Sequence, residues 1–265
     1  MKHDFNKEEI SIIEIKKRQL FILNILKKFC RENFINYSLS AGTLIGCIRH
    51  KGYIPWDDDI DVVMPRPDYE KFLKTFNHSD LKVWHCYQEG YNHPFAKLAD
   101  NNTIIKENIN MNVQYGVNID IFPLDGTFKG ILGNIHAFVV RNLYNCLMVK
   151  LIKHKKDRKL TKVIILGILK LLLFVFPQKL IVKIIDRISS LVDYNKSEYV
   201  AELIWTKKIE KSKTFSGYTL GEFEGNKYQI CVGYDFYLRS IFGDYMTPPP
   251  ENQRKTTHEF SAYIK

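Results

Sequence analysis

Apolar residues recur at helical spacing at the start of the chain and at strand spacing soon after it. Residues 7–33 place isoleucine, leucine and phenylalanine three, four and seven positions apart with lysine and glutamate between them, which predicts an amphipathic helix. Residues 35–40 form a short β-prone run that leads into the turn Gly42-Thr43, and the apolar residues that follow predict a short helix ending near Gly52. The chain therefore opens with a helix, followed by a strand, a tight turn and a second helix.

Two later runs alternate in the manner of β-strands and carry carboxylates. Residues 57–64 follow Pro55 and are expected to form a strand. Because side chains alternate between the two faces of a strand, three aspartates should point to the same face: Asp57, Asp59 and Asp61. In residues 116–123 apolar side chains alternate with polar ones, which places Asp120 on the face opposite to the apolar side chains. We therefore expect two strands that each present acidic side chains on a single face.

Leucine, isoleucine, valine and lysine dominate residues 131–193 at helical spacing, a composition unlike the region before it. Farther along, Gly225 and Asn226 indicate a hairpin, and residues 235–241 indicate a helix. We expect an α/β fold with a mixed-sheet core, flanking helices and an inserted helical region. The expected parts are a core with an N-terminal helix, a mainly helical insertion, and a C-terminal segment that completes the core and the rim of the active site: 1–126, 127–212 and 213–265.

The chain has 265 residues, of which 45% are hydrophobic, enough to bury the core of a globular protein. Its net charge of +10 favours polyanions or anionic lipid surfaces as partners. The five cysteines are widely spaced and never form a Cys-x-x-Cys pair, so we expect neither disulfides nor zinc, and a reducing cytoplasm. The charged N-terminus lacks the apolar run of a secretion signal.

A basic stretch and an apolar stretch adjoin within the helical region. Residues 150–162 hold seven lysine and arginine residues against one aspartate, and residues 163–176 are interrupted by Lys170. The apolar run is too short and too charged to span a bilayer, but it can lie in the membrane interface beside anionic headgroups. A buried helix with a solvated basic flank is the alternative, and both interpretations stay open. We expect no nucleic-acid binding, because no aromatic residues interleave with the lysines.

The acidic run predicts metal-assisted phosphate chemistry. Carboxylates this close repel each other unless a cation lies between them, and oxygen ligands suit Mg²⁺, with Mn²⁺ as the second choice. Backbone N–H groups at the helix start near Gly42, together with the Thr43 hydroxyl, can hold a phosphate. Asp120 can orient or deprotonate an attacking hydroxyl. A solvated acidic loop or a structural Ca²⁺ site is the alternative interpretation.

This layout is similar to that of the nucleotidyltransferase superfamily, and longer motifs sharpen the likeness. The motifs are SAGTLIG at 40–46, RHKG at 49–52, IPWDDDID at 54–61, IDIFPLDG at 119–126 and FGDYMTPPP at 242–250. Together they resemble the LicD family of bacterial phosphorylcholine transferases, which is related to the animal fukutin-related ribitol-phosphate transferases. The resemblance extends from about residue 20 to the end of the chain, and residues 127–210 contribute little to it.

The resemblance implies a nucleotidyltransferase-like core and Mg²⁺-dependent transfer of phosphocholine from CDP-choline to a hydroxyl of a glycan precursor, for teichoic acid or lipopolysaccharide. The family's Asp-x-Asp falls on Asp59 and Asp61, its preceding aspartate on Asp57 and its third acidic position on Asp120. All four are expected metal ligands, and Asp59, Asp61 and Asp120 are expected to be catalytic. The animal relatives add a cysteine-rich zinc element that the cysteine spacing here does not reproduce, which again predicts no zinc.

Four basic residues are candidates for binding the donor's phosphates. Arg49, His50 and Lys51 can bind the diphosphate, although cations at a helix end also suit the helix dipole. Lys97 lies in an apolar, strand-like stretch, where it either points inward to phosphate or belongs to an edge strand. Asp125 is expected to shape a turn with Gly126 rather than to bind metal.

Aromatic residues and the C-terminal residues supply the remaining candidates. Trp56, Tyr53 and Tyr245 can form a cation–π box for choline, with ordinary packing in the core or at the rim as the alternative. Arg254 and His258 can close over the site, or belong to a frayed tail.

We therefore expect a phosphotransferase for substituted phosphate groups, acting in the cytoplasm at the inner face of a bacterial membrane. Its expected partners are a CDP-alcohol, a lipid-linked glycan acceptor and, at the periphery, the membrane. A donor such as CDP-ribitol, or a nucleotidyltransferase reaction, is the nearest alternative. A membrane- or RNA-binding protein with a structural cation site is the non-enzyme alternative.

Overall fold

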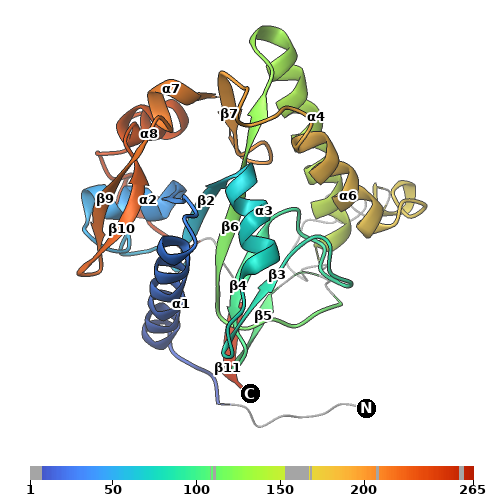
Figure 1. Ribbon diagram of the computed structural model, residues 1–265. Helices are drawn as coiled ribbons and strands as arrows, with labels where there is room; N and C mark the ends of the chain where they lie inside the picture. Colours follow the sequence, from blue (N-terminus) through green and yellow to red (C-terminus); the bar gives the residue numbers. More distant parts are fainter. Residues whose placement is uncertain are drawn as a thin grey trace, which may run out of the picture.

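The structure is a computed structural model, and it describes residues 8–107, 109, 112–152, 167, 169–206, 209–256 and 260–265. A mixed β-sheet runs through the middle of the molecule, with helices packed on both of its faces (Figure 1). This is the α/β architecture that the sequence predicts. Within these described ranges, none of the helices combines the length and the hydrophobicity that crossing a membrane requires.

The central sheet has the strand order β1-β2-β6-β4-β3. These strands are β1 (Ser38–Leu39), β2 (Asp61–Pro65), β6 (Asn118–Thr127), β4 (Ala96–Asp100) and β3 (Leu81–Trp84). β2 and β6 run parallel, and the other neighbours in this order are antiparallel. At its far end β6 also pairs with β7 (Tyr199–Ala201), which pairs with β8 (Ile209–Glu210). The long strand β6 therefore links the acid-bearing part of the sheet to the region expected to be an insertion.

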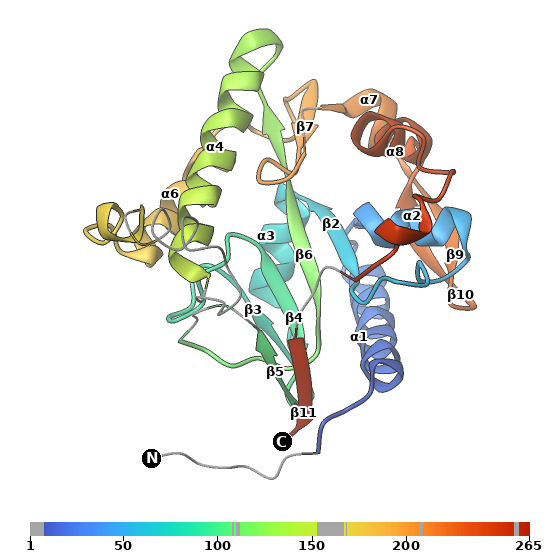
Figure 2. The same cartoon turned by 180° about the vertical axis from the view of Figure 1, so that it is seen from behind.

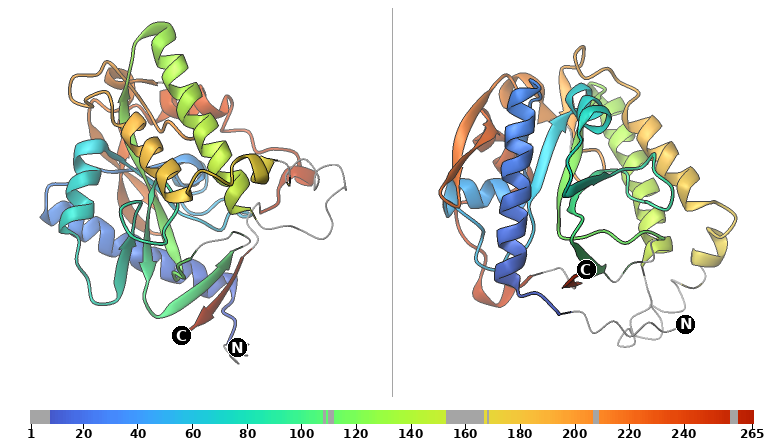
Figure 3. Two further views of the ribbon diagram at one scale, coloured as in Figure 1. Left: turned by 90° about the vertical axis from the view of Figure 1, so that its right-hand side faces the viewer. Right: turned by 60° about the horizontal axis from the view of Figure 1, so that its bottom comes forward.

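Helices cover the sheet in two layers. α1 (Ile12–Glu32) and α3 (Arg66–Thr75) pack on one face, and α4 (Gly130–Leu151) and α6 (Gln178–Ser189) pack on the other (Figure 3). The alternation along β6 explains the two layers, because Ile119 and Ile121 belong to the core that includes α1 and α3, whereas Phe122 packs with α4 and α6. Asp120 lies on the same face as Phe122, so it is directed toward the α4 side of the sheet.

Smaller elements surround this core. The hairpin expected around Gly225 is confirmed as β9 (Tyr218–Phe223) and β10 (Asn226–Cys231), and the helix expected after it as α8 (Tyr234–Phe242). The remaining elements are α2 (Ala41–Arg49), α7 (Lys211–Thr214), η1 (Glu251–Gln253), and the paired strands β5 (Thr103–Glu107) and β11 (Phe260–Ile264). Ile10 N donates to Ala262 O at 2.9 Å, so the segment before α1 runs beside β11 (Figure 2).

The structure corrects the expected direction of the first aspartates. β2 begins only at Asp61, and residues 57–60 form a loop before it, so the period of two does not set the directions of Asp57 and Asp59. The chain turns at Pro55, and a hydrogen bond from Asp57 N to Ile54 O (2.9 Å) closes this turn. The acidic residues therefore reach the sheet from a loop rather than along a strand.

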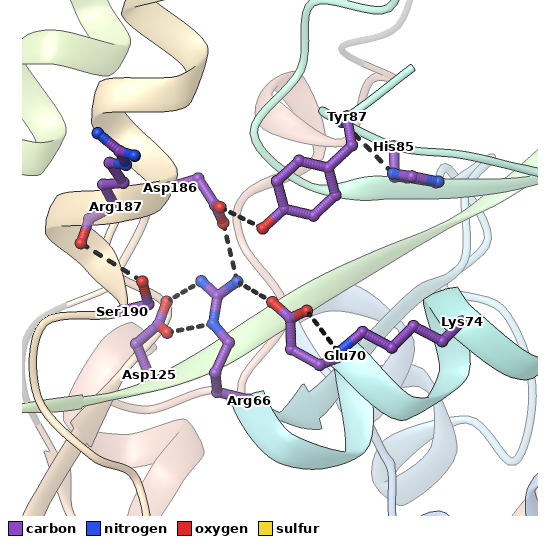
Figure 4. A network of polar contacts seen from close by, with 9 residues as sticks. All are labelled: Arg66, Glu70, Lys74, His85, Tyr87, Asp125, Asp186, Arg187 and Ser190. Atoms are coloured by element: carbon purple, nitrogen blue, oxygen red, sulfur yellow. Dashed lines mark hydrogen bonds and ion pairs between the residues drawn. The ribbon is translucent and has the colours of Figure 1, made fainter.

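Asp125 shapes no turn with Gly126, because both residues lie within β6. The Asp125 carboxylate is buried and accepts two hydrogen bonds from Arg66, from Nε at 2.6 Å and from Nη2 at 2.8 Å (Figure 4). Arg66 Nη1 also donates to Asp186 on α6 at 2.9 Å, and the Tyr87 hydroxyl donates to the same carboxylate at 2.6 Å. The network ties α3, β6 and α6 together, because a buried guanidinium needs such partners to compensate for its lost hydration.

Candidate active site

The start of α2 lies against the acidic loop. Gly42 allows this close approach, because a Cβ atom at this position would lie only 2.6 Å from Asp57 Oδ2. The neighbouring Thr43 is buried, and its Oγ1 accepts a hydrogen bond from the backbone N–H of Asp61 at 2.8 Å. Gly42 and Thr43, the residues that the sequence indicated for phosphate binding, therefore lie next to Asp57 and Asp61, the first and last aspartates of the acidic run.

Asp61 and Asp120 are neighbours across the parallel strands β2 and β6, in register with each other. Residues in register on adjacent strands point to the same face of a sheet, so both carboxylates face the same side. The backbone N–H of Asp120 also donates to the backbone oxygen of Ile60, the residue before Asp61, at 2.9 Å. Pairing of these two strands therefore brings together two acidic positions that are far apart in the sequence.

The acidic loop itself forms a tight cluster of carboxylates. Asp57, Asp58 and Asp59 can each offer one oxygen such that all three atoms lie within 4.8 Å of one another. Asp58, expected on the opposite face, belongs to the cluster, and its Oδ2 accepts a hydrogen bond from Thr256 at 2.6 Å. Gln19 on α1 donates to the backbone oxygen of Asp58 at 3.0 Å. Two distant segments therefore hold the loop in place.

Electrostatic repulsion converges on Asp61. Burial, followed by the charges of Asp59 and Asp120, raises the pKa of Asp61 well above its usual value, and Glu202 and Asp57 add to this effect. A divalent cation among these oxygens would relieve the repulsion, and an all-carboxylate set of ligands is the kind that Mg²⁺ and Mn²⁺ prefer. The residues present at this site therefore fit such an ion.

Lys97 is the positive counterpart of the acidic residues on the sheet. It lies on β4, which is an interior strand between β6 and β3, so the edge-strand alternative is wrong. Its buried Nζ donates to Asp120 Oδ1 at 2.6 Å and to Asn118 Oδ1 at 3.2 Å. Burial alone would lower the pKa of Lys97, but the charges of Asp120 and Glu107 outweigh it and raise the pKa.

Glu202 is a carboxylate near the site that the sequence analysis missed. It is buried after β7 and accepts hydrogen bonds from the Ser40 hydroxyl at 3.0 Å and from the Tyr237 hydroxyl at 2.5 Å. Burial raises the pKa of Glu202, and these two hydrogen bonds oppose the rise. A lone acid in the middle of the apolar run 200–204 was the available signal.

Two arginines lie close to each other near Trp56, which precedes the acidic loop. The Arg254 guanidinium lies over the Trp56 ring, 5.4 Å from its centroid. Arg49 Nη1 donates to Tyr245 O at 2.5 Å, and burial followed by the charge of Arg254 lowers the pKa of Arg49. Two guanidiniums close enough to repel each other form a site that suits an anion such as a diphosphate.

The other sequence candidates occupy mixed positions. Burial, followed by the charge of Arg49, lowers the pKa of His50. Lys51 is exposed, and its backbone oxygen accepts a hydrogen bond from the backbone N–H of Glu224. Tyr53 is directed to α1, where its hydroxyl donates to Gln19 at 2.9 Å and its ring packs on Phe223. These contacts hold Tyr53 against α1 and β9.

Tyr245 is buried, and its hydroxyl donates to Asp235 Oδ1 at 2.8 Å. Its backbone oxygen accepts the hydrogen bond from Arg49. His258 lies outside the described residues. A cavity of about 600 Å³ lies beside the acidic loop, lined among others by Trp56, Asp57 and Thr256.

Comparison with known proteins identifies the family. A family model described as "LicD/FKTN/FKRP, nucleotidyltransferase domain" matches residues 34–160. Over 270 residues the chain is 31% identical to the lipopolysaccharide cholinephosphotransferase LicD of Haemophilus influenzae, covering 95% of this chain and 98% of that protein. The chain belongs to the LicD family. Because it belongs to this family, the chain is a phosphotransferase. The non-enzyme alternative, a membrane- or RNA-binding protein with a structural cation site, is therefore wrong.

Two further relatives are shorter matches. Uncharacterised proteins of Rickettsia typhi and Rickettsia prowazekii are 27% identical over 97 residues and 28% identical over 104 residues, about a third of this chain in each case. The LicD family model covers the acidic loop, Asp120 and Lys97, whereas Glu202 and Arg254 lie beyond it. These outlying residues nevertheless reach the site in the folded chain.

Proposed function

We propose that this chain transfers phosphocholine from CDP-choline to a hydroxyl of a bacterial cell-surface glycan precursor, for lipopolysaccharide or teichoic acid. The observation that carries the proposal is the near full-length match to the Haemophilus cholinephosphotransferase, combined with the gathering of Asp61, Asp120 and the acidic loop at one place. The cavity beside this loop is lined by Trp56, Asp57 and Asp58 but not by Asp61 or Asp120, so the proposal rests on the carboxylates and not on this cavity.

In the proposed reaction an acceptor oxygen attacks the phosphorus that carries choline. The new P–O bond forms as the bond to the CMP oxygen breaks, and the hydroxyl proton passes to Asp120 or, through it, to solvent. Lys97 holds the Asp120 carboxylate at its Oδ1, which fixes the direction from which this base approaches the hydroxyl. CMP leaves as an anion, and phosphocholine stays on the acceptor.

Asp57, Asp59 and Asp61 are the proposed ligands of a Mg²⁺ ion, and Asp120 is a proposed fourth ligand. When bound, such an ion neutralises charge on the diphosphate oxygens. Arg49 and Arg254, whose charges repel each other, are proposed to bind the diphosphate. Trp56 is the aromatic candidate beside the acidic loop, and its ring is proposed to contact the quaternary ammonium of choline.

The test is CMP release from CDP-choline by the purified protein, with and without a crude lipid-linked glycan fraction. We expect release that depends on the acceptor, persists in Mg²⁺ or Mn²⁺, and stops in EDTA. CDP-ribitol is added in competition, because the LicD family is related to the animal fukutin-related ribitol-phosphate transferases. Preferential use of CDP-ribitol would keep the reaction and replace the donor, and release that is indifferent to EDTA would refute the metal dependence.

A further inference from the structure

The N-terminal half of α4 is apolar on both sides, although only one side packs against the protein. Its inner side is buried and includes Ala137, Val140 and Tyr144. The outer side carries large apolar residues with high exposed fractions: Ile131 74%, Leu132 60%, Ile135 51% and Phe138 66%. We call these four residues the α4 outer face. A helix exposed to water normally turns polar residues outward, so this face is suited to contact with something other than water.

The charge around this face indicates its partner. The described residues of this region, 129–152, 167 and 169–185, carry six lysine and arginine residues and no aspartate or glutamate. Lys129 immediately precedes α4, and Lys150 lies in its last turn. Two copies of so basic a surface would repel each other, whereas anionic lipid headgroups would attract it.

The segment after α4 extends the apolar surface in the described residues 169–176. Leu171, Phe174 and Val175 are each more than 70% exposed there. Lys150 Nζ donates to the backbone oxygens of Leu173 and Phe176, at 2.5 Å and 2.8 Å, which attaches this segment to the end of α4. Exposed apolar side chains therefore occur near both ends of the helix.

We propose that the α4 outer face docks on an anionic lipid bilayer, with α4 lying in the interface plane. The helix cannot cross the membrane, because its inner side belongs to the protein core. On that inner side Tyr144 packs in the same core as Phe122 of β6, two positions from Asp120, so one helix connects the proposed docking face to the strand that carries Asp120. This role rests on the proposed function: a protein docked in this way would bring the acidic site close to a glycan acceptor that is anchored in the membrane.

The test is sedimentation with vesicles of phosphatidylcholine, with and without phosphatidylglycerol, at low and at high salt. The wild type should sediment with the anionic vesicles at low salt. The double variant Leu132→Glu/Phe138→Glu should lose about a hundredfold in partitioning, because two apolar side chains no longer leave water. Leu220→Glu is the matched control, since Leu220 on β9 is 64% exposed and lies far from α4 in the chain, and it should sediment like the wild type.

Circular dichroism must show that the double variant folds, and Leu132→Ser/Phe138→Ser replaces it if it does not. A wild type that stays in solution, or a variant that sediments as well as the wild type, overturns the proposal. Self-association of the wild type without vesicle binding, lost in the variant, also overturns it and makes the face an interface between copies. CMP release with detergent-dispersed acceptor should be equal in both proteins, and its absence from both would refute the proposed function while leaving the docking result intact.

Discussion

The Nζ atom of Lys97 lies 2.6 Å from Asp120 Oδ1, and the two residues are also in register across the antiparallel strands β4 and β6. A charged pair inside a sheet is costly to bury, so each partner depends on the other. This pair supplies a positive charge next to a group of carboxylates that otherwise repel each other.

Lys97→Met should therefore impair both the activity and the fold. We expect CMP release to fall by about 10²–10⁴-fold, the range for a misplaced acid or base, and the melting temperature to fall because Asp120 is left without its counter-charge. The double variant Lys97→Met/Asp120→Asn should regain part of the lost stability but none of the activity. Equal melting temperatures for the single and double variants would show that the pair is not coupled.

Asp61→Asn should separate stability from function. Replacing one of several repelling carboxylates should raise the melting temperature in EDTA, while CMP release falls by several orders of magnitude. Mg²⁺ should stabilise the wild type more than the variant, because the ion has fewer charged ligands in the variant. Asp193→Asn, at an exposed loop position, should change neither quantity. Full turnover by Asp61→Asn would remove this residue from the mechanism.

Gly42→Ala tests the packing of α2 against the acidic loop. The new methyl group would lie 2.6 Å from Asp57 Oδ2, so the carboxylate must move. A shift of about 1 Å in a catalytic arrangement can cost roughly a hundredfold in rate, so we expect a loss of that size with the fold retained. Gly217→Ala serves as the control, because its new Cβ would have an ordinary contact of 3.7 Å with Val232. Steady-state kinetics and circular dichroism measure the two effects.

Arg254→Gln should weaken donor binding. Loss of a charge-assisted contact to the diphosphate should raise the KM for CDP-choline by about tenfold or more, with a smaller change in kcat. Arg239→Gln removes an exposed arginine that is paired with Asp235 on α8, and it should leave the KM unchanged. A KM for Arg254→Gln equal to that of the wild type would place the diphosphate elsewhere.

His93 should make the protein sensitive to acid. Burial, followed by the charge of Lys97, lowers the pKa of His93 from 6.5 to about 3, and neither ring nitrogen has a hydrogen-bond partner among the described residues. Between these pH values the unfolded chain binds a proton that the folded chain does not. The free energy of unfolding should therefore fall as the pH drops below 6.5, by up to about 1.4 kcal/mol per pH unit from this group alone.

His93→Phe should flatten this dependence, because phenylalanine can pack on Phe95 without binding a proton. Urea unfolding at about pH 7 and about pH 5 measures the slope. Parallel slopes for the wild type and the variant would mean that other groups cause the acid sensitivity.

Sequence patterns predicted the elements that local interactions determine. α1 follows from apolar periodicity, and the β9–β10 hairpin follows from Gly225 and Asn226, since these signals lie within each element. The alternation in β6 also predicted correctly that Asp120 would face away from Ile119 and Ile121. In these cases the neighbours that decide the structure are close in the sequence.

The expectations that failed depend on distant parts of the chain. Strand alternation could not place Asp57 and Asp59, because a turn at Pro55 and a hydrogen bond from Gln19 to Asp58 shape their loop. The partners of Asp125 and Lys97 lie on other strands and helices. Glu202 was missed because its relation to the site comes from the contact with Ser40, 162 positions away. Such contacts leave no pattern within a short window.

The hydrogen bond from Thr256 to Asp58 joins residues 198 positions apart. During synthesis on the ribosome, the acidic loop is therefore made long before the residue that supports it. A nascent chain that ends before Glu202 has all the aspartates of the loop and strand, yet it lacks Glu202, which accepts from the Ser40 hydroxyl, and Thr256, which donates to the Asp58 carboxylate. The site is therefore completed only near the end of synthesis. A fragment that stops at residue 160, where the family match ends, contains the aspartates but lacks Glu202 and Thr256, which hold their surroundings in place.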